Sequence, residues 1–467
     1  MKFINRHSET RTLRSEYERQ GSSFVVVYGR RRQGKTTLLK EFVKEYPNTI
    51  YYFADKESEQ QQIDKFKQLV SIKQGDTFIS DVSFAHWDKA MEYYAQRTDF
   101  TTKAILIIDE FQYLAMVNPA FPSMLQRYWD TLLKEKNIML VLCGSSLSMI
   151  YSTVLSYGSP LYGRRTSQIH LKNIHFKYFS EFFPDISDAR KLVELYTITS
   201  GIPKYIELLS HDKDIFTKIL QHYLAKDSFL YNDAKFLLMD EVRETINYFG
   251  LLKTIAGGAH KLSDICKRME VPSSKLTPYL ETLRDLDLLE RRVPITESNP
   301  EKSKRGLYFI KDHYMQFWFR YVFPYQSFLE LEQTDWVLDK IKAEFSQYVS
   351  LIFENICRSM IPIWFGATYN LVGSHWEANI EIDVVATSED GQEVLYGECK
   401  WQEQPTGRDV YDALVAKSKS IQPWGKVKNP KVTYALFSKN GFTDEVKKLA
   451  SSKLVLIDFA SLGVKYA

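Results

Sequence analysis

Residues 22–46 read "SSFVVVYGRRRQGKTTLLKEFVKEY", a stretch made of three segments with different patterns. The run "FVVVY" is rich in β-branched residues and predicts a short, buried strand of a parallel sheet. From residue 38 onward, apolar residues recur at helical spacing and predict an amphipathic helix. Between the strand and the helix lies the loop Gly29-x4-Gly34-Lys35-Thr36. This order predicts an α/β domain whose glycine-bounded loop follows a buried strand.

The loop at residues 29–37 has the composition of a site for the phosphates of a nucleotide. Glycines let backbone N–H groups turn inward, and the helix N-terminus adds partial positive charge. In this pattern Lys35 reaches the outer phosphates and Thr36 binds Mg²⁺, so we predict ATP or ADP and Mg as cofactors. For the three arginines, a solvated basic loop is an equal alternative. The predicted contacts are Gly29, Arg30, Arg31, Arg32, Gln33, Gly34, Lys35, Thr36 and Thr37.

A second apolar run, "KAILIIDEFQYL" (residues 103–114), predicts a strand that ends in two adjacent carboxylates. Asp109 is placed to hold Mg²⁺ through a water molecule, and Glu110 to orient and polarise the attacking water. A strand that ends in an acidic turn is the structural alternative. The separation of about seventy residues from the first motif favours the catalytic interpretation, with Lys35, Asp109 and Glu110 acting together.

Two further positions are candidates for sensing the outer phosphate. The strand predicted in "NIMLVLCGSS" (137–146) ends beside Ser145, which either senses the γ-phosphate or caps the next helix. Arg164 lies in "SPLYGRRTSQIHL" (159–171), just before another apolar strand. Either Arg164 or Arg165 acts as an arginine finger, in cis or from a neighbouring subunit, or both form surface ion pairs.

The composition sets the broad class of the protein. At 467 residues, the chain predicts two to four domains. It is 44% hydrophobic and 25% charged with a net charge of +3, which is typical of a globular protein and too mild to indicate nucleic-acid binding. Its four cysteines are too scattered for a zinc site or a disulfide framework. With neither a signal peptide nor a membrane-spanning run, we expect a cytoplasmic protein without membrane contact.

The middle of the chain predicts helices followed by a β-hairpin. Residues 189–210 predict two helices separated by Gly201-Ile202-Pro203, a block typical of a nucleotide lid. Residues 244–312 predict three helices and two strands around a polar tip, which is the winged-helix plan. Basic residues of the third helix and the hairpin fit DNA phosphates, whereas the acidic residues of that helix would repel them. DNA binding and mechanical coupling are therefore both open.

An aromatic-rich run at residues 314–330 follows and predicts packing between domains. Beyond a helix predicted over residues 342–360, residues 364–401 predict two strands joined by the turn "SEDGQ". The first strand carries Asp383 and the second Glu398 and Lys400. Residues two apart in a strand share a face, so Glu398 and Lys400 point the same way and Cys399 points inward. Glu354 lies on the preceding helix.

Together, "GRRRQGKT", "ILIIDE", "LCGSS", "LYGRR" and "SGIPKYI" resemble the prokaryotic AAA-like ATPases of the STAND group, the so-called archaeal ATPase family. The resemblance covers nearly the whole chain in order and spacing. It implies a P-loop core, a helical lid, a winged helix and, as in one large subgroup, a C-terminal restriction-endonuclease-like domain. It assigns Gly201 and Pro203 to the lid signature that packs near the base and sugar. A separate lid arginine is not recognisable, which leaves brisk hydrolysis and a slow, nucleotide-held switch both open.

Asp-x14-Glu-x-Lys after a helical glutamate resembles the PD-(D/E)xK nuclease pattern. The resemblance implies that Asp383 and Glu398 hold Mg²⁺, that Glu354 completes the metal shell, and that Lys400 stabilises charge or orients the attacking water. Asp383, Glu398 and Lys400 are thus candidate catalytic residues. An inert fold that only docks a partner is the alternative.

These patterns predict an α/β multidomain protein. The expected parts are a P-loop ATPase core (1–165), a helical lid (166–238), a winged helix (239–312), a helical connector (313–344) and a restriction-endonuclease-like domain (345–467). We expect the nucleotide state to control a Mg²⁺-dependent, nuclease-like domain that acts on nucleic acid, with DNA as a candidate partner. The alternative is a signalling or scaffold switch that binds a protein partner or a second copy of the chain.

Overall fold

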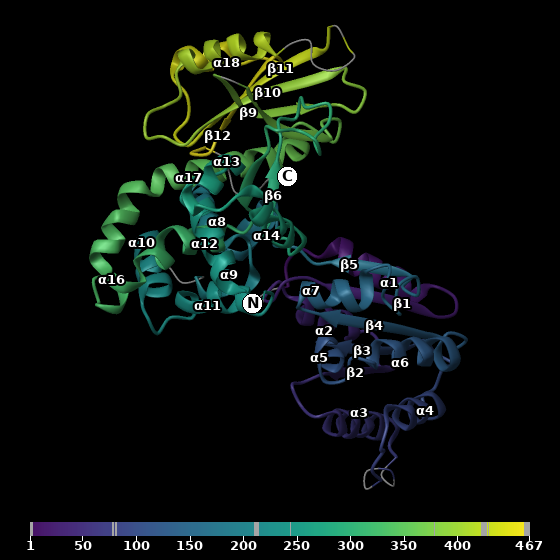
Figure 1. Cartoon of the computed structure of the whole chain (residues 1–467). Helices are drawn as coiled ribbons and strands as arrows, with labels where there is room; N and C mark the ends of the chain where they lie inside the picture. Colours follow the sequence, from purple (N-terminus) through teal and green to yellow (C-terminus); the bar gives the residue numbers. More distant parts are fainter. Residues whose placement is uncertain are drawn as a thin grey trace. The chain divides into compact units, whose positions relative to one another are not determined.

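The computed structural model describes residues 3–76, 79, 82–209, 214–242, 244–377, 379–421, 427 and 429–461 (Figure 1). The chain divides into two compact units, each of which is described by itself. The N-terminal unit comprises residues 1–173 and 202–204, and the C-terminal unit comprises residues 174–201 and 205–467. Among the described residues, no helix combines the length and the apolar character needed to cross a membrane.

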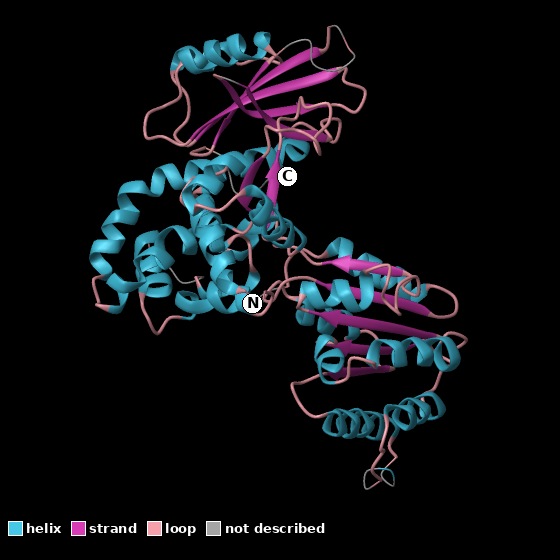
Figure 2. Ribbon diagram, in the orientation of Figure 1, coloured by secondary structure: helices cyan, strands magenta, loops and turns pink. Residues whose placement is uncertain are grey.

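The N-terminal unit is built on a parallel sheet of five strands in the order β2-β3-β4-β1-β5 (Figure 2). The strands predicted from the apolar runs, β1, β3, β4 and β5, are confirmed, whereas β2 was not predicted. Every residue of β1, β3 and β4 is buried, as expected for central strands with helices on both faces. The strands are β1 (Ser23–Tyr28), β2 (Thr49–Phe53), β3 (Ala104–Asp109), β4 (Ile138–Gly144) and β5 (Ser167–His170).

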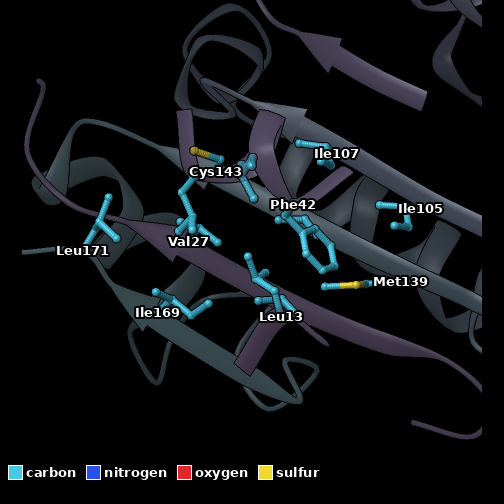
Figure 3. Packing of buried hydrophobic residues seen from close by; sticks show 13 residues of the cluster. Leu13, Val27, Phe42, Ile105, Ile107, Met139, Cys143, Ile169 and Leu171 are labelled. Atoms are coloured by element: carbon cyan, nitrogen blue, oxygen red, sulfur yellow. The ribbon is translucent and has the colours of Figure 1, made fainter. Parts of the chain in front are cut away.

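Helices cover both faces of this sheet. On one face, Leu13 of α1 and Phe42 of α2 pack against strand residues such as Val27, Ile107 and Met139 (Figure 3). The opposite face carries aromatic contacts, including Phe24 against Trp129 with ring centroids 5.1 Å apart. The helices of this unit are α1 (His7–Glu18), α2 (Lys35–Val43), α3 (Glu59–Gln74), α4 (Trp87–Arg97), α5 (Gln112–Val117), α6 (Phe121–Tyr128) and α7 (Leu147–Ile150).

The C-terminal unit begins with helices that surround a buried aromatic core. Tyr314, Phe317, Trp318 and Phe319 are each 0% exposed, so the aromatic-rich run is buried; its predicted place between domains stays a prediction. Gly201 adopts φ +69° between α8 and α9, in agreement with the predicted break. The helices are α8 (Ala189–Thr199), α9 (Pro203–Leu208), α10 (Ile215–Ile219), α11 (Phe229–Met239), α15 (His313–Phe317) and α16 (Gln326–Glu330); α9 spans the boundary between the units.

Residues 245–310 form three helices followed by a two-stranded antiparallel hairpin, in the predicted order. We call this part the helix–hairpin segment, and residues 293–306 its hairpin tip. Leu276, Leu280 and Leu283 of the third helix are buried at helical spacing and form the core of the segment. Its elements are α12 (Thr245–Ala256), α13 (Leu262–Met269), α14 (Ser273–Asp285), β6 (Leu289–Arg292) and β7 (Leu307–Ile310).

The chain ends in a mixed five-stranded sheet of order β12-β11-β10-β9-β8. Strands β10, β11 and β12 are parallel, β9 pairs antiparallel with β10, and β8 pairs antiparallel with β9. The helix predicted over 342–360 belongs to the longer α17, which runs through residues 344 and 345 without a break. The elements are α17 (Thr334–Trp364), β8 (Leu371–Glu377), β9 (Ile380–Thr387), β10 (Glu393–Lys400), α18 (Arg408–Ser420), β11 (Lys431–Ser438), α19 (Asp444–Leu449) and β12 (Leu454–Asp458).

Candidate functional site

The phosphate loop lies between β1 and α2, at the carboxyl edge of the parallel sheet. Gly34 and Arg32 have φ +89° and +72°, so the loop turns back on itself before the helix. A Cβ atom at Gly29 would lie 2.5 Å from the Leu171 carbonyl oxygen and 2.6 Å from Gln33 Oε1. Because that space is already filled, glycine is required at position 29.

Lys35 is 5% exposed at the start of α2. Its ammonium group donates hydrogen bonds of 2.7 and 2.9 Å to the carbonyl oxygens of Gly29 and Arg30. Burial lowers the pKa of Lys35, while nearby groups that include Asp109 and Glu110 act in the opposite direction. The cation is therefore held inside the loop, at the position from which the pattern predicts contact with phosphate oxygens.

Asp109, 0% exposed at the end of β3, is the acceptor for two hydroxyl groups. Thr36 Oγ1 and the Tyr51 hydroxyl donate to its Oδ2 atom at 2.9 and 2.6 Å. The structure thus brings the predicted Thr36 and Asp109 together, and their oxygen atoms are the kind of donors that Mg²⁺ prefers. Tyr51 was not predicted to be here, although the β-branched and aromatic residues of "TIYYF" could have indicated the strand that carries it.

Glu110 has φ +55°, a left-handed conformation that is rare for a residue with a side chain. Its Oε2 atom accepts a 2.7 Å hydrogen bond from Ser145 Oγ and another from the Gln112 side chain. Gln112 Nε2 also donates to Ser145 Oγ at 3.0 Å. The predicted Glu110 and Ser145 therefore meet in one polar cluster, which Gln112 completes. Such backbone strain persists only where surrounding contacts hold it, and it is common at functional sites.

Gln33 connects the phosphate loop to two distant parts of the N-terminal unit. Arg6, only 5% exposed, donates from Nη2 to the Gln33 carbonyl oxygen at 2.9 Å. Gln33 Nε2 donates to Asn173 Oδ1, also at 2.9 Å. Arg31 Nη2 donates to the Tyr113 hydroxyl at 3.2 Å.

The other predicted nucleotide contacts lie at various places in the fold. Thr37 is exposed in the first turn of α2, and Arg30 and Arg32 are half-buried. Arg164 forms an ion pair with Asp130, with its Nη2 atom 2.8 Å from Oδ2. Gly201 packs against Ile174, whose carbonyl oxygen lies 2.2 Å from the position of a Cβ on Gly201. Pro203 Cγ lies 4.0 Å from the position of a Cβ on Gly34, so this residue, predicted to belong to a lid, adjoins the phosphate loop.

A second polar cluster lies in the C-terminal sheet. Asp383 of β9 accepts a 2.8 Å hydrogen bond on Oδ2 from the Cys399 backbone N–H of β10. Glu398, 6% exposed, accepts from Lys400 Nζ at 2.9 Å. This contact confirms that Glu398 and Lys400 share a face, as predicted. Cys399 is buried, which was also predicted.

Negative charge is concentrated in this cluster. Burial, with the added repulsion of Glu354 and Glu398, raises the pKa of Asp383 to about 7. Burial also raises the pKa of Glu354, whose Oε2 atom lies 3.5 Å from Arg358 Nη1. Arg358 also donates to the Asp383 carbonyl oxygen at 2.6 Å, which links α17 to β9.

A second lysine, absent from the sequence prediction, contacts the same cluster. Lys417 Nζ, on α18, lies 3.2 and 3.1 Å from the Oε1 and Oε2 atoms of Glu398. Within the described residues, no three His, Cys, Asp or Glu side chains gather closely enough to hold a metal ion. Arg358 approaches the Glu354 carboxylate, and Lys400 and Lys417 contact the Glu398 carboxylate. The three-carboxylate metal shell that the resemblance implied is not assembled in this structure and stays a prediction.

The basic residues of the hairpin tip and its strands make contacts within the C-terminal unit. Arg291 Nη1 donates to the Pro300 carbonyl oxygen at 2.9 Å, and Arg292 stacks on Phe309 at 4.2 Å from the ring centroid. Arg305 pairs with Glu297 at 3.0 Å. Three of the cations that were candidates for contact with DNA phosphates thus have partners in the chain itself.

Comparison with known proteins identifies two regions of this chain. A family described as an ATPase domain predominantly from Archaea matches residues 3–209, and a family described as archaeal and bacterial proteins of unknown function matches residues 318–411. An uncharacterized protein of Methanocaldococcus jannaschii is 36% identical over 429 residues, which cover 90% of this chain and 92% of that protein. An uncharacterized ATP-binding protein of the same organism is 38% identical over 42 residues, or 9% of this chain and 71% of that protein.

Solved structures show more distant likeness. The Walker-type ATPase of Pyrococcus abyssi aligns with a TM-score of 0.48 and 18% identity, covering 68% of this chain and 96% of that one. The Aeropyrum pernix ORC2 protein aligns with a TM-score of 0.44 and 14% identity, covering 72% and 95%. The family assignment rests on the sequence matches. This chain belongs to the family of its Methanocaldococcus jannaschii relative and carries an archaeal-type P-loop ATPase domain at residues 3–209.

Proposed function

We propose that the N-terminal unit binds ATP together with Mg²⁺ and hydrolyses it. The observation that carries this proposal is the convergence of Lys35, Thr36, Asp109, Glu110 and Ser145 at one edge of the parallel sheet. These residues lie at the ends of three elements: the start of α2, the end of β3 and the end of β4. Hydrogen bonds connect them directly or through the loop. Such an arrangement has the cation, the oxygen donors and the general base that phosphoryl transfer to water needs.

Each residue has a separate task in this proposal. Lys35 and the loop N–H groups hold the outer phosphates, while Thr36 and Asp109 would hold Mg²⁺, which supplies charge neutralisation on the phosphate oxygens. Glu110 orients the attacking water and accepts its proton. Ser145 and Gln112 fix the Glu110 carboxylate, which is otherwise free to rotate on a strained backbone. Pro203 lies next to Gly34 and would contact the nucleotide as a lid residue.

The Lys35→Ala variant tests the nucleotide site. We expect calorimetry to show loss of ATP binding by about a hundredfold or more, because a buried charge-assisted contact to phosphate is removed. Lys40→Ala is the matched control, since Lys40 is exposed on the same helix. Unchanged circular dichroism would show that the fold remains. Wild-type affinity in Lys35→Ala would remove the phosphate-loop assignment.

We propose further that the nucleotide state controls the C-terminal unit, where the helix–hairpin segment is a winged helix and the mixed sheet is a restriction-endonuclease-like domain. Asp383 and Glu398 lie on neighbouring antiparallel strands with Lys400 beside them. Two carboxylates suit Mg²⁺, which usually takes one or two from a protein. Bound there, the ion would activate water for attack on a phosphodiester; Lys400 would stabilise the charge that develops on phosphate.

Plasmid cleavage in Mg²⁺ tests this part of the proposal. We expect wild-type protein to nick or linearise DNA, and Asp383→Ala to be at least about a hundredfold slower. Glu389→Ala is the control, because Glu389 is an exposed carboxylate in the turn of the same hairpin. Chelation of divalent cations should have the effect of Asp383→Ala. Cleavage at the same rate by Asp383→Ala would assign the activity to another site or a contaminant.

One observation favours a second function, a switch that binds a protein partner. The hairpin tip is hydrogen-bonded to β8, with the Ile295 N–H 2.9 Å from the Ser374 carbonyl oxygen. A hairpin tip bound in this way connects the helix–hairpin segment to the mixed sheet. Because its arginines have partners in the chain itself, fewer cations are left for DNA. If no DNA or RNA is cut under any nucleotide condition, the switch becomes the leading function and the sheet a docking module.

A further inference from the structure

Two lysines from different elements contact one buried carboxylate. Glu398 is 6% exposed and accepts hydrogen bonds from Lys400 on its own strand and from Lys417 on α18. A single cation would suffice to neutralise Glu398. Pairing with the Glu398 carboxylate alone therefore does not explain why a second lysine lies here.

The packing of α18 fixes where Lys417 points. Leu414 and Ser418 are both 0% exposed, and Ser418 Oγ lies 3.0 Å from the Tyr434 hydroxyl of β11. Lys417 lies three residues after Leu414 and one before Ser418, so it belongs to the helix face that packs on the sheet. Lys419, two residues further on, is exposed. The helix thus presents one lysine to the cluster and one to solvent.

Lys417 retains capacity for another acceptor. An ammonium group has three N–H donors. Among the described residues, its acceptors are the two oxygens of Glu398, at 3.2 and 3.1 Å. One donor is left for a further oxygen atom. Asp383, Glu354 and Glu398 together would repel an approaching phosphate group, so a phosphodiester needs an added cation to lie against them.

We propose that Lys417 is a substrate-positioning residue that contacts a non-bridging oxygen of the phosphodiester bound at Asp383 and Glu398. This inference rests on the proposed nuclease function and deepens it, because it names the nucleic-acid backbone as the group that the site recognises. Lys400 stabilises the charge that develops during cleavage. Lys417 binds the phosphate group before cleavage begins. The two lysines therefore have separable effects on rate and on binding.

Salt dependence provides a readout that a purely structural lysine would not change. Each phosphate contact to duplex DNA adds about 0.9 to the slope of log affinity against log salt. Anisotropy of a fluorescent duplex in EDTA measures this slope without metal and without cleavage. For Lys417→Met we expect about tenfold weaker binding and a slope smaller by about 0.9. Lys419→Met is the matched control and should keep the wild-type slope.

Cleavage kinetics in Mg²⁺ complete the test. Lys417→Met should raise KM by about tenfold and change kcat by less than about threefold, and Lys417→Arg should restore KM because the positive charge returns. Lys417→Gln replaces Lys417→Met if the latter melts at a lower temperature than wild type. A wild-type salt slope in both Lys417→Met and Lys417→Gln would overturn the proposed role of Lys417 and leave the nuclease function standing. A wild-type protein that neither binds nor cuts nucleic acid would overturn the nuclease function itself, and this inference with it.

Discussion

At Asp109, a single carboxylate oxygen accepts hydrogen bonds from two hydroxyl groups that come from different elements. Thr36 approaches from α2 and Tyr51 from β2. Burial raises the pKa of the Tyr51 phenol well above its ordinary value, and the neighbouring Asp109 adds to the effect, so the phenol stays protonated as a donor. Tyr51 therefore fixes the rotamer of the carboxylate that is proposed to lie in the metal shell.

Tyr51→Phe tests this role by the removal of one oxygen atom. We expect the rate of ATP hydrolysis to fall by about tenfold, because a hydrogen bond to a charged group contributes on the order of 1.5 kcal/mol. ATP binding in EDTA should be unchanged, since Tyr51 acts on Asp109 and not on the phosphates. Hydrolysis assays and calorimetry, with and without Mg²⁺, measure the two effects separately.

Tyr46→Phe is the matched control for this variant. Tyr46 packs against the same core through its ring, which lies 4.8 Å from the Phe42 ring by centroids. A similar loss in Tyr46→Phe would point to core packing instead of Asp109. An equal loss of ATP affinity in EDTA and in Mg²⁺ would also contradict the argument, because the phenol would then act on the loop and not on the metal ligand.

At the scale of elements, the hairpin tip lies on β8, the edge strand of the C-terminal sheet. An exposed edge strand offers unpaired N–H and C=O groups for association with other chains, so proteins commonly cover it. Here the Ile295 N–H bonds to Ser374, and Trp376 Nε1 donates to the Arg305 carbonyl oxygen at 3.2 Å. Ile295 also packs against the apolar core of the sheet. The hairpin therefore shields the edge and joins the two parts.

Ile295→Asp should release the hairpin tip from β8. A half-buried isoleucine replaced by a carboxylate costs about 2 to 3 kcal/mol from lost packing and desolvation. We expect faster hydrogen exchange in residues 371–377 and 293–306, and a lower temperature of unfolding. Ile246→Asp is the control, because Ile246 is 86% exposed. Unchanged exchange in β8 would show that the tip does not hold the edge strand.

Most of the strands that carry the two sites could be predicted because each has a strong local signal. β1, β3 and β4 are continuous apolar runs, and Asp383, Glu398 and Lys400 lie on the two strands that flank the turn "SEDGQ". Lys417 and Tyr51 could not be assigned in this way. Lys417 meets Glu398 only because α18 packs on β10, and Tyr51 meets Asp109 only because β2 pairs with β3. Both contacts depend on tertiary packing between residues far apart in sequence, which no local pattern records.

The whole molecule is divided into two units, and the chain passes between them at the edge of the nucleotide site. The boundaries fall at residues 173/174, 201/202 and 204/205. Asn173 is the last residue before the first crossing, and its side chain accepts the hydrogen bond from Gln33 of the phosphate loop. Leu171 lies against Gly29, and Pro203 against Gly34. We therefore expect a change in the loop upon nucleotide binding to reach the segments that leave the unit.

Asn173→Ala tests whether this hydrogen bond transmits the nucleotide state. In wild-type protein we expect ATP to slow hydrogen exchange over residues 174–204, a change absent in Lys35→Ala. Asn173→Ala should lose at least about half of that protection, because one hydrogen bond contributes on the order of 1 kcal/mol to the coupling. Its ATP affinity should change by less than about fivefold, since Asn173 contacts Gln33 and not a phosphate. Asn48→Ala is the control, as the Asn48 side chain donates its hydrogen bonds to Asp99 and Thr102 elsewhere in the same unit. If Asn173→Ala keeps the full ATP-dependent protection, the signal leaves the loop by another route, and the contact of Pro203 with Gly34 is the next to test.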